Sequence, residues 1–442
     1  MELKKYRLDN VATFEISNVD KKSKSGEQSV RLCNFTDVYY NWAVNESISK
    51  KFMVATASET QIKKLSLKKG QVAITKDSET RHDIGIPCYI AESFKDCVLG
   101  YHCALITPNP ELLDGCYLNA YLNSKLAKEY FANNASGSGM RYSLPIDSIK
   151  NIILYLPDIE TQRAVGKIFS NIDRKIALNR EINRNLEAMA RQLYDYWFVQ
   201  FDFPDENGRP YKSSGGKMVW NEKLKREIPE NWKSTKISEI AKTYSGGTPT
   251  SSNKDYYNSK DVPWINSGEL NESFISATDN YISDFGLRNS SAKLYPANSI
   301  LVALYGATAG KVSFLSFEAS SNQAVCGVIP NYVNLAEYLY FALSSLCQYY
   351  ISLSSGSARD NISQATVKDT LLFMPDNNIM EEFHNLVSPI FEKIINGRLE
   401  NLNLIKQRDE LLPLLMNGQV SVMPQEVNCD LFASVLYWSK KL

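Results

Sequence analysis

Residues that could carry out catalysis are few in this chain, and their spacing does not suit it. The 442 residues include only three histidines, and none lies at a metal-ligand spacing from another or in a pattern with a nucleophile. The segment GATAGK at Gly306–Lys311 has three residues between its glycines, where a phosphate-binding loop has four, and Val312 replaces the Ser or Thr that holds magnesium. A glycine-rich turn after a strand is the better interpretation. We therefore predict that the chain is not an enzyme.

The eight cysteines do not form the CxxC pairs that are typical of zinc sites. Cys97, His102 and Cys103 come closest to a metal cluster, but the second half of the chain has no matching residues. A metal site and buried free thiols in a reducing compartment are the two interpretations that this leaves. We favour the thiols and predict no metal.

Terminus and composition together indicate a cytoplasmic protein. The N-terminus, MELKKYRLDNVATF, has no apolar signal core, and no apolar run approaches the length of a membrane span. The 49 basic and 49 acidic residues cancel, which disfavours a non-specific coat for polyanions. A nucleic-acid-binding face remains possible, because binding depends on the local potential rather than on the net charge. We expect no membrane partner.

Polar loops with basic and aromatic residues are the chemistry that the chain does offer. Side chains of this kind on a firm scaffold can contact the phosphates and base edges of DNA. The alternative is that these loops are ordinary solvated turns. The candidate DNA-binding residues are Lys63, Lys64, Lys76, Arg81, Arg141 and Tyr142 in the first half, and Thr248, Tyr305, Lys311, Ser357, Arg359 and Asn361 in the second.

Two of these candidates occupy matching places in a duplicated sequence. The segment RYSLPIDSIKNIILYLP at Arg141–Pro157 aligns without a gap with RDNISQATVKDTLLFMP at Arg359–Pro375, at an offset of 218 residues. Such a period is far too long for a solenoid. We therefore predict a chain of two similar modules, which suits a target with two parts, such as a stretch of double helix.

Each module begins with short apolar runs broken by turn signals and continues into helices, which predicts a mixed α/β (α+β) fold in two pseudo-symmetric copies. The first module is expected to have strands at 71–75 and 103–107 and a helix at 117–131. The second is expected to have strands at 299–304 and 324–329 and a helix at 338–351.

A long amphipathic helix follows each module. In the first, apolar residues recur at spacings of 3 and 4, which is typical of a coiled-coil seam. The seam positions are Val165, Ile168, Ile172, Lys175, Asn179, Ile182, Leu186, Met189, Leu193 and Tyr196. The offset of 218 gives the second seam as Phe383, Leu386, Ile390, Lys393, Gly397, Glu400, Leu404, Gln407, Leu411 and Leu414.

The simplest packing places these two helices against each other. From the seams we predict contacts of the helix pair or a partner at Ile172, Ile182, Leu186, Leu193, Leu404 and Leu411. The alternative is that each helix packs on its own module. Residues 200–231, rich in Pro, Gly and charge, are interpreted as a connector, and residues 421–442 have no counterpart in the first half.

Over residues 1–420 the chain resembles the specificity subunit of Type I restriction-modification systems. The segments that carry the resemblance are LYLPDIETQR at Leu154–Arg163, LFMPDNNIMEE at Leu372–Glu382, the stretch Leu193–Trp220 with IPENW at Ile228–Trp232, SGGTP at Ser245–Pro249, WINSGEL at Trp264–Leu270 and RDELLPLLMNGQV at Arg408–Val420. The first module departs from the pattern, because it lacks a GGTP-like turn.

What the resemblance implies is two target-recognition domains, 1–157 and 232–375, separated by an antiparallel coiled coil of two long helices, 158–199 and 376–420. Each domain would read one half of a split, asymmetric DNA site, and the helices would act as a spacer. Two modification subunits carrying S-adenosylmethionine would methylate an adenine, and restriction subunits using ATP and Mg²⁺ would cleave. The chain itself would bind no cofactor.

Two further functions remain as alternatives. One is a stand-alone sequence-specific DNA-binding regulator, which would have to hold its site tightly without partners. The other is the specificity subunit of a phage-defence complex that methylates DNA but has no nuclease. Adjacent genes would separate the second alternative from restriction.

Overall fold

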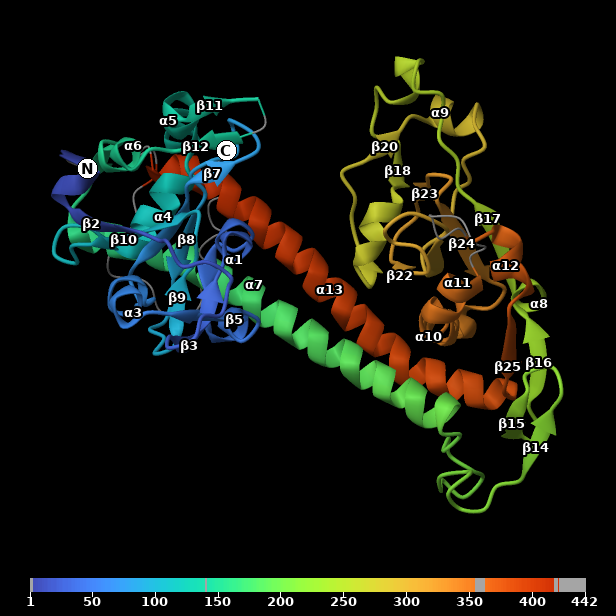
Figure 1. Cartoon of the computed structure of the whole chain (residues 1–442). Coiled ribbons are helices and arrows are strands. Elements are labelled where there is room, and N and C mark those ends of the chain that lie inside the picture. Colours follow the sequence, from blue (N-terminus) through green and yellow to red (C-terminus); the bar gives the residue numbers. More distant parts are fainter. Residues whose placement is uncertain (1–2, 140, 354–361, 417–419, 421–442) are drawn as a thin grey trace. The chain divides into compact units, whose positions relative to one another are not determined.

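The computed structural model describes residues 3–139, 141–353, 362–416 and 420. It divides into two compact units, one of residues 1–177 with 403–442 and the other of residues 178–402. The division cuts both long helices, so that each unit contains part of each (Figure 1). Within the described ranges, no helix is long and apolar enough to cross a membrane.

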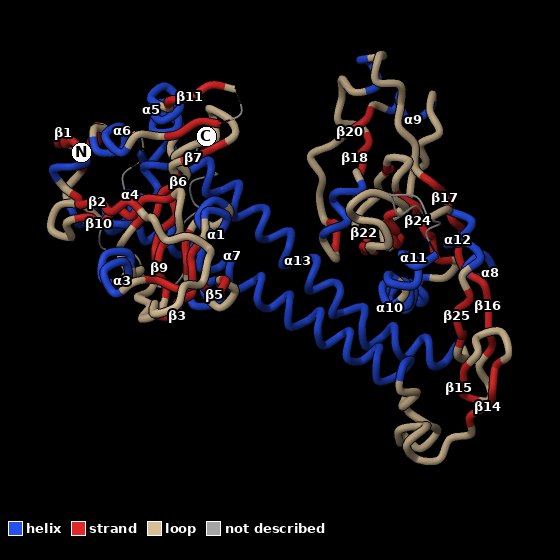
Figure 2. Tube along the Cα trace, viewed as in Figure 1, coloured by secondary structure: helices blue, strands red, loops and turns tan. Residues whose placement is uncertain are grey.

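The first unit is a mixed α/β domain built on a five-stranded sheet of order β2-β10-β6-β8-β4 (Figure 2). Two three-stranded sheets, β5-β3-β9 and β11-β12-β7, and the strand pair β1–β13 complete it. Its strands are β1 Lys4–Arg7, β2 Ala12–Ile16, β3 Gln28–Cys33, β4 Ala43–Val44, β5 Met53–Ala57, β6 Val72–Thr75, β7 Asp77–Ser78, β8 Pro87–Ile90, β9 Cys97–Leu99, β10 Cys103–Pro108, β11 Ser136–Ser138, β12 Arg141–Ser143 and β13 Ile153–Leu156. Its helices are η1 Leu8–Asn10, α1 Phe35–Tyr39, α2 Glu46–Ser49, α3 Glu59–Leu65, α4 Gly115–Asn123, α5 Lys125–Asn134 and α6 Ile146–Lys150.

The second unit has the same plan, with a five-stranded sheet of order β17-β24-β21-β22-β19 and a smaller sheet β20-β18-β23. Its strands are β14 Met218–Asn221, β15 Arg226–Pro229, β16 Lys233–Lys236, β17 Ala241–Ser245, β18 Val262–Ile265, β19 Phe274–Ile275, β20 Tyr281–Ile282, β21 Ser299–Ala303, β22 Val312–Leu315, β23 Ser320–Ser321, β24 Val325–Pro330 and β25 Leu371–Met374. Its helices are η2 Asp195–Val199, α8 Ile237–Ile240, η3 Lys254–Tyr256, η4 Ser267–Asn271, α9 Asp284–Arg288, η5 Val333–Leu335, α10 Ala336–Ser345, α11 Cys347–Leu353 and α12 Gln364–Asp369.

Equivalent residues of the two domains can be matched through the strand register. Ile16 pairs with Ala104 across β2 and β10, and Ser245 pairs with Cys326 across β17 and β24. In both smaller sheets the central strand pairs antiparallel with one neighbour and parallel with the other. The predicted α/β fold in two copies is therefore confirmed, although few side chains are shared between the copies.

The expected strands and helices are found with small changes of boundary. The helix expected at 117–131 is two helices, α4 and α5, because Ser124 ends the first and its hydroxyl accepts from the Ala127 N–H as the cap of the second. The helix expected at 338–351 is likewise α10 followed by α11. The segment Gly306–Lys311 forms a turn, as predicted, with positive φ at both of its glycines.

Two long helices, α7 at Ile159–Tyr194 and α13 at Asn377–Met416, pair with each other within each unit (Figure 1). In the first unit Val165 of α7 lies in one apolar cluster with Leu412 and Leu415 of α13. In the second unit Ala190 lies in a cluster with Val387. The beginning of α7 thus packs against the end of α13, and the end of α7 packs against the beginning of α13. This is the predicted antiparallel pairing.

The predicted seam is correct at alternate positions and wrong by one residue at the others. On α7 and the following η2 the buried residues at those other positions are Phe169, Ile176, Asn183, Ala190 and Trp197, where Ile168, Lys175, Ile182, Met189 and Tyr196 were expected. Because an α-helix has 3.6 residues per turn, steps of three and of four both stay near one stripe, and the sequence pattern selected the wrong step. Ile182 is therefore 45% exposed, whereas Asn183 is 6% exposed.

The other predicted helix-pair residues lie at or near the contact. Leu404 is buried, and Leu411 packs against the core cluster of the first unit. Leu186 and Leu193 pack, partly buried, against the core of the second unit. Ile172 is half-buried.

The segment predicted to be a connector is packed into the second unit rather than extended as a linker. Phe201 and Phe203 lie in the core cluster of that unit with Trp232, and their rings stack or meet edge to face with the indole. Residues 218–229 form the hairpin β14–β15. Burial of these rings explains why a stretch rich in Pro, Gly and charge has a defined path here.

Candidate nucleic-acid interface

In both domains the candidate DNA-binding loops leave the main sheet at the same end. In the first unit β6 ends at Thr75 where β10 begins at Cys103, so that the segments after Thr75 and before Cys103 emerge together. In the second unit β21 ends at Ala303 opposite Val325, the first residue of β24. The equivalent ends of the two main sheets therefore carry the loops that contain predicted DNA-binding residues.

A backbone hydrogen bond ties the later loop of each domain to this end. The Leu144 N–H donates to the Lys76 carbonyl at 2.7 Å, and the Ile362 N–H donates to the Leu304 carbonyl at 2.6 Å. Leu144 and Ile362 are separated by the 218 residues of the sequence repeat, which shows that the repeat marks the same structural position. Ser357, Arg359 and Asn361 lie outside the residues that the structure describes.

Four candidates of the first unit gather around β7 and β12. Arg141 and Tyr142 belong to β12, and Tyr142 pairs with Ser78 of β7. Lys76 directly precedes β7, and the Arg81 Nε donates to the Ala132 carbonyl at 3.0 Å. These residues form one region, as expected for a binding surface.

Lys63 and Lys64 belong elsewhere. They are exposed in the last turn of α3, which packs against β9, and α3 lies away from β7 and β12 within the first unit (Figure 1). Lysines at the C-terminal end of a helix stabilise it through its dipole, so that a role in the helix explains this pair without DNA.

A groove of about 550 Å³ opens beside Arg141. Residues of α1, of the segment after β6, of the β9–β10 turn and of β12 line it. They are Phe35, Thr36, Tyr39, Tyr40, Asp77, Ser78, Glu79, Thr80, Asp83, His102 and Arg141. We call this the β7–β12 groove. Arg141 is the one predicted DNA-binding residue among them, because basic side chains were the signal for such residues and the carboxylates next to Lys76 do not carry it.

Hydrogen bonds hold the walls of the β7–β12 groove. His102 has a positive φ of 69°, which is uncommon for a residue other than glycine, and its Nδ1 lies 2.5 Å from the Asp77 carboxylate. The Tyr39 hydroxyl donates to the Asp83 carboxylate, and this hydrogen bond raises the pKa of Tyr39 to about 12. Backbone strain of this kind is found most often at functional sites.

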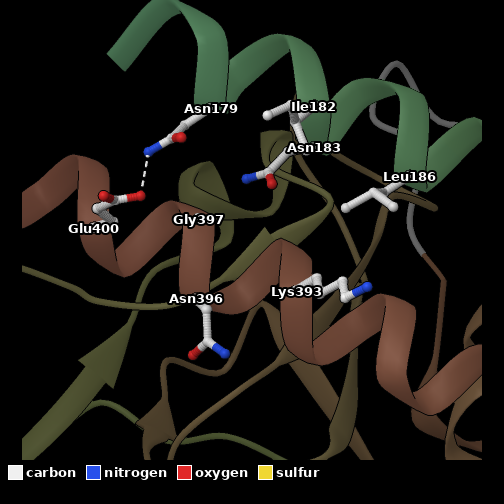
Figure 3. Close-up of a pocket in the computed structure, with 8 residues that line it drawn as sticks. All are labelled: Asn179, Ile182, Asn183, Leu186, Lys393, Asn396, Gly397 and Glu400. Atoms are coloured by element: carbon white, nitrogen blue, oxygen red, sulfur yellow. Dashed lines mark hydrogen bonds between the residues drawn. The ribbon is translucent and has the colours of Figure 1, made fainter. Parts of the chain in front are cut away.

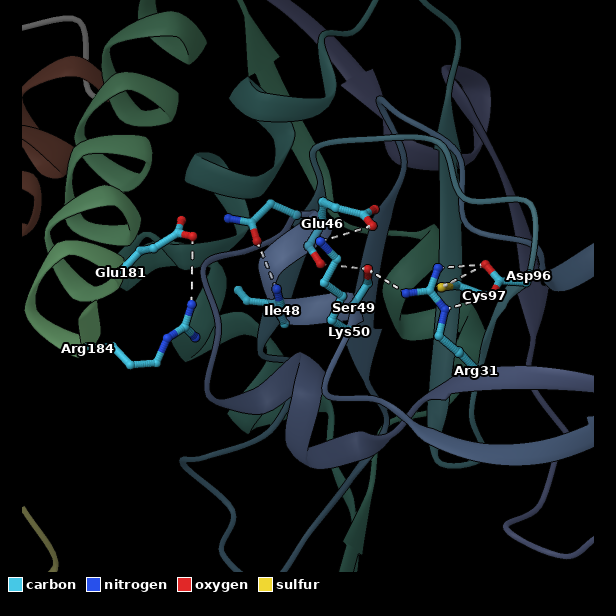
Figure 4. A network of polar contacts seen from close by, with 10 residues as sticks. Arg31, Glu46, Ile48, Ser49, Lys50, Asp96, Cys97, Glu181 and Arg184 are labelled. Atoms are coloured by element: carbon cyan, nitrogen blue, oxygen red, sulfur yellow. Dashed lines mark hydrogen bonds and ion pairs between the residues drawn. The ribbon is translucent and has the colours of Figure 1, made fainter. Parts of the chain in front are cut away.

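Arg141 and Glu79 differ from these fixed residues. Both are exposed, and neither side chain makes a hydrogen bond or an ion pair with any residue that the structure describes. Arg31, in contrast, donates from two nitrogens to Asp96 at 2.7 Å and from a third to the Ser49 hydroxyl at 3.0 Å (Figure 4). Arg31 therefore links β3 to the rest of the unit, while Arg141 donates to none of the described residues.

In the second unit the SGGTP turn is held by close packing. A Cβ on Gly246 would lie 2.2 Å from the Asn322 carbonyl, and one on Gly247 would lie 2.3 Å from the Ala292 nitrogen. The Trp264 Nε1 donates to the Gly247 carbonyl at 3.0 Å. Glycine is therefore required at both positions, and the exposed Thr248, whose hydroxyl donates to Gln323, is carried on a firm base.

Tyr305 and Lys311 bracket the loop after β21. Tyr305 packs, partly buried, on the core of the second unit, and the Lys311 ammonium donates to Asn271 of η4. Thr248 and Lys311 each have a protein partner at the surface. A contact of either with DNA would compete with that partner, so that these assignments stay predictions.

Among the described residues, no three His, Cys, Asp or Glu side chains are grouped so that they could hold a metal ion. Cys97 and Cys103 are buried in an apolar cluster with Cys33 and Cys88, and burial raises the pKa of all four thiols. His102 faces Asp77 instead. These cysteines behave as buried apolar side chains.

A polar layer interrupts the helix pair within the second unit (Figure 3). The Asn179 amide donates to Glu400 at 2.7 Å and to Asn401 at 3.1 Å. The Asn183 amide donates to the Ile394 carbonyl at 3.1 Å, beside Gly397. A cavity of about 600 Å³ adjoins the layer, and Ile182 and Lys393 lie at its edge. Buried amides of this kind set the register of paired helices.

Comparison with known proteins identifies relatives along most of the chain. The family model described as the Type I restriction modification DNA specificity domain matches residues 2–188 and 229–404. The Type I restriction enzyme HindI specificity subunit of Haemophilus influenzae is 30% identical over 408 residues, which cover 81% of this chain and 88% of that protein. The MjaIX specificity subunit of Methanocaldococcus jannaschii is 25% identical and covers 69% of each chain.

A solved structure has the same fold. The S subunit of a Type I restriction-modification system from M. genitalium superposes with a TM-score of 0.56, covering 94% of this chain and 96% of that one, at 14% sequence identity. At this identity the likeness concerns the fold alone. It agrees with the two domains and the paired long helices described above.

Proposed function

The chain belongs to the family of Type I restriction-modification DNA specificity subunits, and from that premise we propose that it reads a split, asymmetric DNA site for a complex that methylates and cleaves DNA. Each domain reads one half of the site. Two modification subunits with bound S-adenosylmethionine methylate an adenine, which has to leave the base stack to be reached. Restriction subunits use ATP and Mg²⁺, and the chain supplies no catalytic group. The complex acts on DNA in the cytoplasm.

The observation that carries the proposal is the repetition of one scaffold with different loops. Both domains have the same strand order and register, and the loops of both leave the equivalent end of the sheet. Phe35, Asp77 and Arg141 line the groove of the first domain, whereas Thr248 and Tyr305 lie on the loops of the second. A shared scaffold with unlike loops suits a site whose two halves differ in sequence.

Docking of partner subunits is supported by an apolar stripe on α7. Ile182 and Met189 are 45% and 46% exposed, and Tyr196 follows at the same spacing of seven residues. One helical stripe of large apolar side chains in water is unfavourable for an isolated protein and is typical of a protein–protein contact. We call these three residues the apolar flank.

Single-molecule methylation sequencing tests the proposal. A host expressing this chain with its neighbouring modification gene should gain a split motif with methylated adenine in both parts, and the same host lacking this chain should not. No new mark, with both proteins expressed, would contradict the proposal and favour the partner-free regulator. A new mark without any restriction of unmethylated phage DNA would favour the defence complex that lacks a nuclease.

A further inference from the structure

We propose that the β7–β12 groove reads a G·C base pair in the half-site of the first domain. Arg141 donates to O6 and N7 of the guanine, and Glu79 accepts a hydrogen bond from the N4 amino group of the cytosine. This inference rests on the proposed function and adds to it the residues and the base pair that one domain recognises.

The pairing of β12 with β7 brings the positions of Arg141 and Glu79 near each other. On β12 and β7, Ser143 pairs with Asp77 and Tyr142 pairs with Ser78. Arg141 and Glu79 come next along the two segments, with Glu79 in the bend that directly follows β7. Tyr142 packs on the core of the unit, and neighbouring side chains of a strand point to opposite faces, so that Arg141 points away from the core. Arg141 and Glu79 both line the groove.

The two side chains are unoccupied while their neighbours are engaged. The carboxylate of Asp77 is taken by His102 and that of Asp83 by the Tyr39 hydroxyl. Opposite charges on neighbouring residues of one groove would ordinarily pair, yet no ion pair joins the described side chains of Arg141 and Glu79. One guanidinium and one carboxylate therefore remain to bind a ligand in a groove whose walls are already fixed.

The charge of the groove favours base edges over phosphates. Three carboxylates, of Asp77, Glu79 and Asp83, line it beside one arginine. A phosphate-binding surface needs an excess of positive charge, whereas carboxylates repel the DNA backbone. In the major groove, cytosine presents an amino donor that Glu or Asp accepts, and guanine presents two acceptors that Arg contacts with both ends of its fork. Arg141 and Glu79 together therefore match the guanine and the cytosine of one G·C base pair.

Binding competition with the purified complex of this chain and its modification subunit tests the inference. Once the methylated motif of the wild type is known, each base pair of both half-sites is changed in turn. Glu79→Ala and Arg141→Lys should each reduce discrimination at the same G·C pair by about tenfold or more, because a good side-chain contact to a base contributes about that much. Discrimination at every position of the other half-site should be unchanged.

Arg141→Lys separates base reading from backbone contact, because lysine keeps the charge but lacks the two-pronged geometry. An Arg141→Lys variant that retains full discrimination, or a Glu79→Ala variant that does so, would overturn the inference. An equal loss of affinity for all sequences would also overturn it, since that marks a contact with phosphate or a structural role. Glu129 is an exposed carboxylate of α5 in the same domain, and Glu129→Ala is the matched control that should behave as wild type.

Failure of the inference and of the proposed function give different results. A wild-type complex that methylates a split motif, together with variants that read it unchanged, leaves the proposed function standing and removes only the inference. A wild-type complex with no motif overturns both. If Glu79→Ala does not assemble on size-exclusion chromatography, Arg141→Lys alone decides, because both substitutions are expected to affect the same base pair.

Discussion

Individual charged residues in this protein differ chiefly in whether a partner holds them. Arg31 and Asp96 share two hydrogen bonds, and the guanidinium lowers the pKa of the Asp96 carboxyl. Arg141 has no such partner among the described residues. Composition cannot distinguish these two arginines, since the distinction depends on residues 18 to 65 positions away in sequence.

At the residue scale, Gly397 is required by Asn183. A Cβ at Gly397 would lie 2.6 Å from the Asn183 Oδ1, and Asn183 is held by its hydrogen bond to Ile394. Gly397→Ala should lower the free energy of unfolding by about 1 kcal/mol, because loss of a buried amide hydrogen bond outweighs the gain in helix propensity. Urea unfolding of the two proteins measures this change in the free energy of unfolding.

The same substitution in an Asn183→Ala protein tests whether Asn183 causes the destabilisation. In an Asn183→Ala protein the obstructing amide is absent, and Gly397→Ala should instead stabilise by up to about 1 kcal/mol through helix propensity. If Gly397→Ala changes the free energy of unfolding with the same sign in both backgrounds, something other than the contact with Asn183 determines its effect.

At the scale of elements, each long helix begins with the same Pro-Asp dipeptide. Asp158 accepts from the Thr161 N–H at 2.9 Å and from its hydroxyl at 2.7 Å, which lowers the pKa of Asp158. The Met380 N–H donates to the Asp376 carbonyl at the matching place of α13. Sequence alignment already set these two residues opposite each other, and the structure confirms their shared role as helix starts.

Asp158→Ala should destabilise the protein by about 0.5–1 kcal/mol at neutral pH, as expected for loss of an exposed N-cap. The pKa of Asp158 is lowered in the folded state, so its contribution is present above the unfolded pKa of about 3.9 and is lost as pH falls through the folded value. Thermal unfolding between neutral and acidic pH should therefore show the two proteins converging in acid. Asp158→Asn keeps an acceptor and should lose less at neutral pH.

The corrected seam of α7 can be tested with two neighbouring apolar residues. Ile176 is 3% exposed and Ile182 is 45% exposed. Ile176→Asp buries an unpaired charge and should cost about 3 kcal/mol or more, whereas Ile182→Asp should stay within about 1 kcal/mol. The apolar flank should nevertheless need Ile182, so that Ile182→Asp weakens co-purification with the modification subunit. Equal thermal stabilities of the two variants would contradict the corrected seam and favour the seam predicted from the sequence.

At the scale of the whole molecule, duplication allows one chain to present two unlike reading surfaces. The strand order of the two main sheets is the same, but the segment after β6, residues 77–83, carries three carboxylates, whereas the segment after β21, residues 305–311, carries none. Loops tolerate such divergence because they carry little of the core, whereas strands and helix starts do not.

Arg141→Ala and Arg359→Ala should alter different halves of the methylated motif. The two residues occupy matching positions of the sequence repeat, one in each module, and Arg359 lies outside the described residues. Methylation sequencing of hosts carrying each variant should show relaxed or reduced marking that maps to one half for the first variant and to the other half for the second. Changes confined to the same half for both would contradict the assignment of one domain to each half-site.

Sequence was sufficient for the duplication, the α/β class, the paired helices and the family, because these depend on long patterns in which many residues agree. The offset of Arg141 and Arg359 places Leu144 and Ile362 on equivalent hydrogen bonds. The seam was half correct, and the +4 step would have replaced Lys175 by Ile176 and Lys393 by Ile394, a signal that was present but not used. Tyr305, Lys311 and Thr248 stay predictions.

Tertiary structure was needed to learn which side chains are free. Glu79, Asp77 and His102 come from separate segments, and their meeting with Arg141 depends on how β7, β12 and the β9–β10 turn pack. The sequence contains no signal that distinguishes a loop carboxylate that accepts from a base from one that is only solvated. Periodic burial leaves its pattern along the chain, whereas a site made of single residues from distant loops does not.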